Sequence, residues 1–100
     1  MAVVFLTITP LGTGTPSVSR YVAGVERILR ETGLTHQLTA MGTIIEGDLD
    51  EILAVVRRMH EHPFTQGAVR VSTLLKIDDR RDRPHTIAGK MRSVEEKLGK

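Results

Sequence analysis

The order of β-prone and helical segments constrains the fold of this chain more than any other feature of its sequence. Residues 2–9 are dense in β-branched side chains and stop at Pro10, which cannot donate a hydrogen bond to a central ladder. Two short β-prone stretches, residues 35–39 and 42–46, follow each other so closely that they predict a tight hairpin. Residues 69–77 return to β character. Together these segments predict a four-stranded antiparallel sheet.

Two amphipathic helical patterns lie between the β-prone segments. Thr15, which precedes a proline, predicts the start of the first helix, and Gly33 predicts its end. Asp48 and Glu51 resemble a capping box at the start of the second helix, which Pro63 is expected to end or kink. The apolar stripes at helical spacing are Val18, Tyr21, Val25, Ile28 and Leu29 in the first helix and Leu49, Ile52, Leu53, Val56 and Met59 in the second.

A third apolar stripe follows the last β-prone segment and the charged turn at residues 78–84. It consists of Ile87, Met91, Val94 and Leu98. The order strand, helix, hairpin, helix, strand predicts an α+β fold, a ferredoxin-like βαββαβ sandwich with an additional C-terminal helix. With 100 residues and neither a linker nor a repeat, the chain is expected to form one domain over residues 1–100.

The apolar residues of the predicted strands do not alternate cleanly between the two faces of the sheet. Two helices cover one face of such a sheet, so a second face in contact with water should be polar. We expect a homo-oligomer, a dimer or tetramer that joins through sheet faces. Cover by the C-terminal helix and ordinary scattered exposure are the alternatives. The inner set is Val4, Leu6, Ile8, Ile45, Val71, Leu75 and Ile77, which leaves Val3, Phe5, Ile44 and Leu74 pointing outward.

Composition removes several classes of function. The absence of cysteine excludes disulfides, thiolate zinc sites and thiol nucleophiles, and the four histidines lack metal-ligand spacing, so no metal is expected. An aromatic content of 3% and a net charge of +2 argue against nucleic acid as a partner. The N-terminal apolar run is far shorter than the roughly 20 residues of a bilayer span. We therefore expect no membrane partner and a cytoplasmic location.

Three segments in this order carry a resemblance to a known family. They are LGTGTPSVS at residues 11–19, QLTAMGTIIEGDLDE at residues 37–51 and IDDRRDRPHTIAGKMRSVEEKL at residues 77–98. With them the chain resembles the thiamine-binding protein family nearly from end to end. It departs from the family around Pro63, where the family pattern has an uninterrupted helix. The resemblance implies a ferredoxin-like fold, dimers or tetramers, and binding of thiamine or its hydroxymethylpyrimidine part. It does not imply a catalytic activity, so we expect neither an enzyme nor a cofactor besides this ligand.

With this ligand class in view, the predicted hairpin supplies the first candidate site residues. An aminopyrimidine needs a donor and an acceptor along one edge and apolar contacts on its faces, and these residue types occur in Thr39, Met41, Thr43 and Glu46. Glu46 can accept from the exocyclic amine, although a surface ion pair is its alternative role. Thr43 and Glu46 point to opposite faces of a regular strand, so a site that touches both requires a bulge, a strand end or a subunit interface.

Four further residues are candidates outside the hairpin. Tyr21, the only tyrosine, is either part of the core or a ring that lies against the ligand. Ser17 and Ser19 follow a glycine-rich loop at a helix start, where backbone N–H groups favour anions, although a simple turn before a capped helix is the other interpretation. Asp78 belongs to the charged run of the third segment, which makes it a candidate ligand or interface residue.

The sequence therefore predicts a small-molecule binding protein that buffers, delivers or senses its ligand. An enzyme acting on a related heterocycle and a regulatory interaction module without a ligand are the alternatives. A Ser-His-Asp relay drawn from Ser17, His36 and Asp78 has no nucleophile elbow to support it. If the ligand carries a phosphate, its expected contacts are the glycine-rich loop or Arg80 and Arg81.

Overall fold

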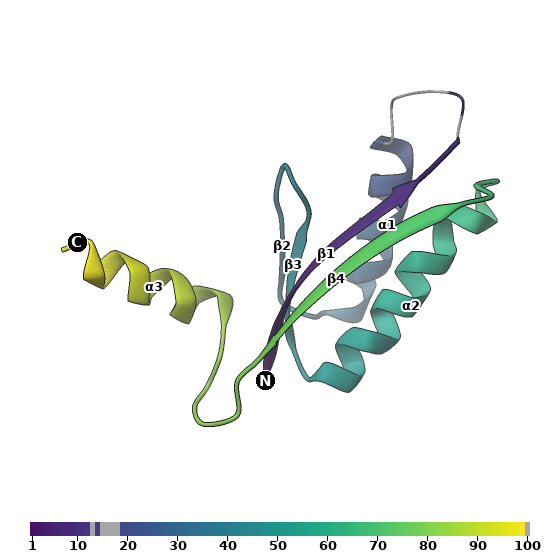
Figure 1. The fold of residues 1–100 in the computed structure, drawn as a ribbon. Helices are drawn as coiled ribbons and strands as arrows, with labels where there is room; N and C mark the ends of the chain where they lie inside the picture. Colours follow the sequence, from purple (N-terminus) through teal and green to yellow (C-terminus); the bar gives the residue numbers. More distant parts are fainter. Residues whose placement is uncertain (13, 15–18, 100) are drawn as a thin grey trace.

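The computed structural model describes residues 1–12, 14 and 19–99. Its elements, in chain order, are β1 (Ala2–Pro10), α1 (Ser19–Thr32), β2 (His36–Leu38), β3 (Thr43–Gly47), α2 (Leu49–Thr65), β4 (Val71–Asp79) and α3 (Ile87–Lys97). The strands form one antiparallel sheet in the order β2-β3-β1-β4 (Figure 1). The predicted ferredoxin-like fold with an additional C-terminal helix is confirmed. The helix start predicted at Thr15 lies outside the described residues.

Strand β1 is central, but its two neighbours cover different lengths of it. Pairing with β4 runs from Ala2 opposite Asp79 to Pro10 opposite Val71. Pairing with β3 stops at Leu6 opposite Thr43. The last residues of β1 therefore continue past the first residue of β3, beside the turn between β2 and β3. Strand β4 begins two residues later than predicted, because Val69 lies in the exposed connection before it.

The hydrophobic core lies between the sheet and helices α1 and α2, which cover the same face of the sheet (Figure 1). We term this the helix-covered face and the opposite one the outer face. Of the predicted inner residues, Val4, Leu6 and Ile45 are buried, while Ile77 is 44% exposed near the end of the edge strand. The buried core residues are Ala2, Val4, Leu6, Val25, Leu29, Ile45, Ile52, Val55, Val56 and Met59.

Helix α2 starts as predicted and differs from the prediction in its stripe and its end. The Asp48 side chain caps it by accepting from the backbone N–H groups of Asp50 and Glu51. The stripe contains Val55, which is 3% exposed, in place of Leu53, which is 40% exposed. Pro63, which was expected to end or kink the helix, does not end it, since the helix continues to Thr65.

Helix α3 projects away from the body of the molecule (Figure 1). The Thr86 hydroxyl caps its start by accepting from the Gly89 N–H, and none of its residues is buried. Its apolar stripe is confirmed as a helical face, yet Val94 and Leu98 remain 55% and 65% exposed. Among the described residues, no helix is both long and apolar enough to cross a membrane.

Candidate functional site

A cavity of about 200 Å³, termed the hairpin cavity, lies beside the turn between β2 and β3, on the helix-covered face of the sheet. It forms where β1 continues past Thr43, the first residue of β3, and so lacks a paired neighbour on that side. The walls come from this part of β1, from the turn and from helix α1. Apolar side chains make up most of its walls. They include Leu6, Ile8, Val22, Val25, Leu38 and Met59.

The polar feature of the hairpin cavity is a buried hydrogen bond between β3 and α1. The Thr43 hydroxyl donates to Glu26 Oε1 at 2.5 Å, and the two residues are 6% and 8% exposed. No cation pairs with Glu26 in the part of the chain that the structure describes. A buried carboxylate is unfavourable unless it is paired or fully hydrogen-bonded. The cavity therefore offers a strong hydrogen-bond acceptor, and a negative charge when Glu26 is ionised, to whatever fills it.

The hairpin turn holds the mouth of the cavity in a fixed shape. The Thr39 hydroxyl donates to the Gly42 carbonyl at 2.8 Å and accepts from the N–H groups of Met41 and Gly42. A Cβ atom at Gly42 would lie 2.9 Å from the Leu6 carbonyl oxygen, so only glycine allows this close approach to β1. Thr39 uses its single proton within the turn and therefore shapes the site, while the exposed Met41 lines its mouth.

Glu46 and Asp78 lie on the outer face, away from the hairpin cavity. Val3 pairs with Glu46 on one side and with Asp78 on the other, and paired residues of neighbouring strands share a face. Thr43 and Glu46 thus point to opposite faces, as the regular strand predicted. The candidate residues do not form one site, because Thr39, Met41 and Thr43 meet at the cavity while Glu46 and Asp78 flank Val3.

Asp78 connects the end of β4 to helix α3. Its carboxylate accepts a hydrogen bond from Lys90 at 2.7 Å. The buried Nε2 atom of His85 lies 3.2 Å from the same oxygen, at an angle outside that of a hydrogen bond. The Lys90 ammonium, and to a smaller extent the His85 ring, lower the pKa of Asp78 below its usual value. Asp78 also borders a groove of about 210 Å³ between the outer face and the start of α3.

The remaining candidates lie at or before the start of α1. Tyr21 is buried, its hydroxyl accepts a hydrogen bond from Arg20, and the Arg20 guanidinium lies 4.9 Å from the ring centroid. It does not line the hairpin cavity. Ser19 is the exposed first residue of α1, and Ser17 lies outside the described residues.

Glu26 is the residue that sequence reasoning missed. It follows Val22 by four residues and precedes Leu29 by three, so helical spacing places it at the margin of the buried stripe. A carboxylate at such a position is the signal that was available. No group of three His, Cys, Asp or Glu residues is placed to hold a metal ion within the described ranges.

Comparison with known proteins shows the family. The family model described as "Thiamine-binding protein" matches residues 4–95. The chain belongs to the thiamine-binding protein family. The UPF0045 protein YqgV of Bacillus subtilis is 48% identical over 102 residues, which cover 98% of each chain. A UPF0045 protein of Methanothermobacter thermautotrophicus is 43% identical over 94 residues, covering 93% of this chain and 95% of the relative.

Solved structures of related proteins show the same fold as this thiamine-binding family member. The hypothetical protein MJ1052 of Methanocaldococcus jannaschii superposes with a TM-score of 0.86 at 39% identity, covering 95% of this chain and 96% of its own. A Thermotoga maritima protein superposes with a TM-score of 0.77 at 19% identity, covering 93% and 97%. At that identity the second likeness shows the fold alone.

Proposed function

We propose that the chain binds thiamine or its hydroxymethylpyrimidine moiety in the hairpin cavity and serves as a binding protein that buffers, delivers or senses this ligand without converting it. The observation that carries the proposal is Glu26, a buried carboxylate that faces the cavity, accepts a hydrogen bond from Thr43 and has no ion-pair partner among the described residues. A ligand that brings N–H donors or positive charge would offset the free-energy cost of burying the Glu26 carboxylate.

The chemistry of an aminopyrimidine fits the walls of the cavity. Its exocyclic amine can donate to Glu26, and a protonated ring nitrogen can donate to the same carboxylate. Leu6, Val22 and Met59 are placed to contact the faces of the ring. The family to which the chain belongs carries thiamine binding in its name, and the Thermotoga maritima neighbour is assigned by name to thiamine biosynthesis or salvage. Both names agree with this class of ligand.

The size of the cavity favours one ring over two. A cavity of about 150 Å³ in another protein holds benzene, and pockets for drug-sized molecules begin at about 300 Å³. The hairpin cavity, at about 200 Å³, has room for a single ring with small substituents. We therefore place the pyrimidine inside and let the remainder of thiamine extend past Met41 at the mouth.

Calorimetric titration with thiamine, its phosphates and hydroxymethylpyrimidine tests the proposal. Glu26→Gln keeps the shape of the side chain and removes its charge, so we expect at least a tenfold loss of affinity, as for a charge-assisted hydrogen bond. Thr43→Val should weaken binding less. Glu31→Gln, at an exposed position of the same helix, is the matched control and should bind normally.

Three results would contradict the proposal. The first is no binding of any of these compounds by the wild-type protein, which would favour a regulatory module. The second is a loss on Glu46→Gln with none on Glu26→Gln, which would move the site to the outer face. The third is conversion of the ligand on incubation with the protein, detected chromatographically, which would indicate an enzyme.

We also propose that the protein is a homo-oligomer, a dimer or tetramer in which a second copy covers the outer face. That face carries Leu74, which is 61% exposed, beside the half-buried Phe5 and Ile44. Helix α3 shields Val3 but leaves most of its own apolar stripe uncovered. Covering apolar surface stabilises by about 25 cal/mol per Å². A two-fold pairing of identical faces covers both surfaces at once.

Light scattering at micromolar concentration tests this assembly. Leu74→Lys places a charge on the outer face and should shift the protein to smaller species. Leu53→Lys changes an exposed leucine on α2, away from that face, and should leave the mass unchanged. A wild-type protein that is monomeric at this concentration would overturn the assembly.

A further inference from the structure

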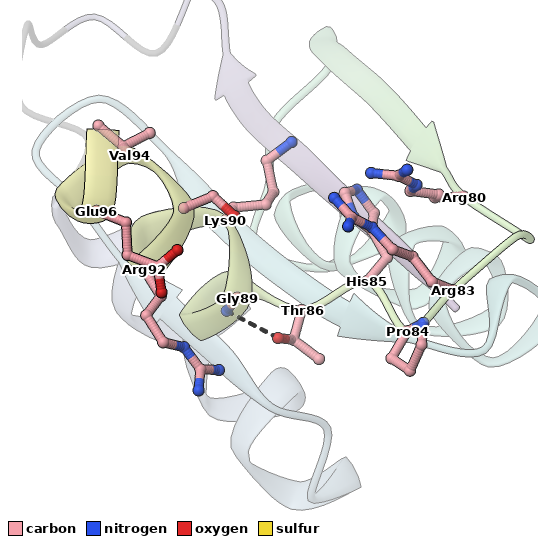
Figure 2. Close-up of a pocket in the computed structure, with 11 residues that line it drawn as sticks. Arg80, Arg83, Pro84, His85, Thr86, Gly89, Lys90, Arg92, Val94 and Glu96 are labelled. Atoms are coloured by element: carbon pink, nitrogen blue, oxygen red, sulfur yellow. Dashed lines mark hydrogen bonds between the residues drawn. The ribbon is translucent and has the colours of Figure 1, made fainter. Parts of the chain in front are cut away.

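A second and larger pocket, of about 570 Å³, lies between the loop after β4 and helix α3 (Figure 2). We term it the basic pocket. Glu96 is the one carboxylate among the described residues that line it. His85, from the loop, is 9% exposed and forms part of its wall. The positive charges come from the loop and the helix, and they belong to Arg80, Arg83, Lys90 and Arg92.

The carboxylates of the charged turn do not neutralise all of these cations. Each is already engaged by a basic side chain, in the pairs Asp78–Lys90 at 2.7 Å, Asp79–Arg81 at 2.8 Å and Asp82–Arg80 at 2.6 Å. Arg81 is thereby held outside the pocket, which separates it from Arg80. Arg83 and Arg92 have no ion-pair partner in the described part of the chain. Two guanidinium groups at the pocket therefore remain available to a ligand.

The two walls of the basic pocket are tied together at one end. Asp78, at the end of β4, accepts from Lys90 of α3 and lies against the buried His85 ring. The Thr86 hydroxyl accepts from the Gly89 N–H and so holds the first turn of the helix. These contacts keep the loop arginines and the helix cations around a common space before any ligand enters. Preorganisation of this kind lowers the entropy lost on binding.

We propose that the basic pocket binds a phosphate-type oxyanion, either free phosphate or pyrophosphate or the phosphate group of a small metabolite. The planar guanidinium of Arg83 can bind two oxygens of such a group at once, and the guanidinium of Arg92 supplies a second positive charge at the pocket. No Phe, Tyr or Trp is among its described lining residues, so the pocket lacks the large aromatic side chains on which bases stack. The inference does not rest on the proposed function, because the basic pocket and the hairpin cavity share no lining residue.

Titration with inorganic phosphate, pyrophosphate and phenyl phosphate, followed by amide chemical shifts at low salt, tests the inference. We expect shifts centred on Thr86, Gly89 and Arg83, and pyrophosphate should bind more tightly than phosphate because it carries more charge. Arg83→Gln should weaken pyrophosphate binding about tenfold, and Arg92→Gln less. Arg58→Gln, at an exposed arginine on α2 that does not line the basic pocket, is the control and should leave the affinity unchanged.

The three ligands also separate the two sources of the anion. Tighter binding of phenyl phosphate than of inorganic phosphate identifies an esterified ligand, and the reverse order identifies the free anion. The inference is overturned if millimolar pyrophosphate produces no shifts, or if Arg58→Gln weakens binding as much as Arg83→Gln. It is also overturned if a single-stranded oligonucleotide binds more tightly than pyrophosphate, because the surface would then serve nucleic acid.

Discussion

Helices α2 and α3 look alike in the sequence and behave differently in the structure. Both begin at a capping side chain, Asp48 or Thr86, and both carry an apolar stripe at helical spacing. Helix α2 buries residues along its whole length, whereas α3 buries none. Connectivity explains the contrast, because α2 joins two strands of one sheet and must cross a face of it, while α3 follows the last strand (Figure 1). Periodicity thus predicts that a helix has an apolar face, and chain topology decides whether the same subunit covers that face.

The largest expected contrast between the two helices is in the effect of truncating an apolar side chain. Ile52 of α2 is fully buried, so Ile52→Ala should lower the free energy of unfolding by about 2–5 kcal/mol. Val94→Ala in α3 should change it by less than about 0.5 kcal/mol in dilute, monomeric protein. Urea denaturation followed by circular dichroism measures both.

Repeating these unfolding measurements at several protein concentrations shows whether a second copy covers helix α3. A loss from Val94→Ala that grows with concentration would mean that a second copy covers the stripe of α3. Equal losses from Val94→Ala and Ile52→Ala in dilute protein would contradict the comparison, since α3 would then pack against its own subunit in solution.

The helix caps should give a smaller contrast. Asp48 accepts from two backbone N–H groups of a helix that is part of the core, so Asp48→Ala should lower the free energy of unfolding by about 1 kcal/mol. Thr86→Ala should instead fray α3 locally, because few contacts connect this helix to the core. Amide hydrogen exchange separates the outcomes, and faster exchange in α2 on Thr86→Ala would argue against independent helices.

The smallest expected effect is the response of the loop after β4 to acid. Arginine and lysine partners lower the pKa values of Asp78, Asp79 and Asp82, that of Asp82 to about 2 from the usual 3.8. Because these values are depressed in the folded chain, the carboxylates stabilise it fully above pH 4 and lose that contribution as the pH falls toward 2.

Amide chemical shifts followed through this pH range locate the change. The loop and α3 should respond, whereas the middle of α2, residues 52–60, has no carboxylate of its own and should keep its shifts over the range in which the three aspartates titrate. Parallel changes in α2 and α3 would show that the two helices are coupled after all. The effect on overall stability should be slight, because these carboxylates face solvent and their ion pairs are screened.

The candidate site could be predicted as far as local rules extend. Strand alternation correctly put Thr43 and Glu46 on opposite faces, and the hairpin brought Thr39, Met41 and Thr43 to one end of the sheet. The partner of Thr43 was not predicted, because Glu26 lies on a different element and only the packing of α1 against β3 brings the two together. The basic pocket itself was not predicted. The sequence suggested only the glycine-rich loop, or Arg80 and Arg81, as contacts of a phosphate, and Arg83 rather than Arg81, which pairs with Asp79, lines the pocket beside Arg80.

The sequence by itself determined which segments become strands and helices, because caps, prolines and the periodicity of apolar residues act over only a few positions. It also determined the family, through motifs spread along nearly the whole chain. Only the tertiary structure decided that Glu26 is buried against Thr43, that Asp78 is paired with Lys90 of α3, and that α3 stays uncovered. These outcomes depend on contacts between segments that are distant in the sequence, and patterns that extend over only a few residues do not specify such contacts.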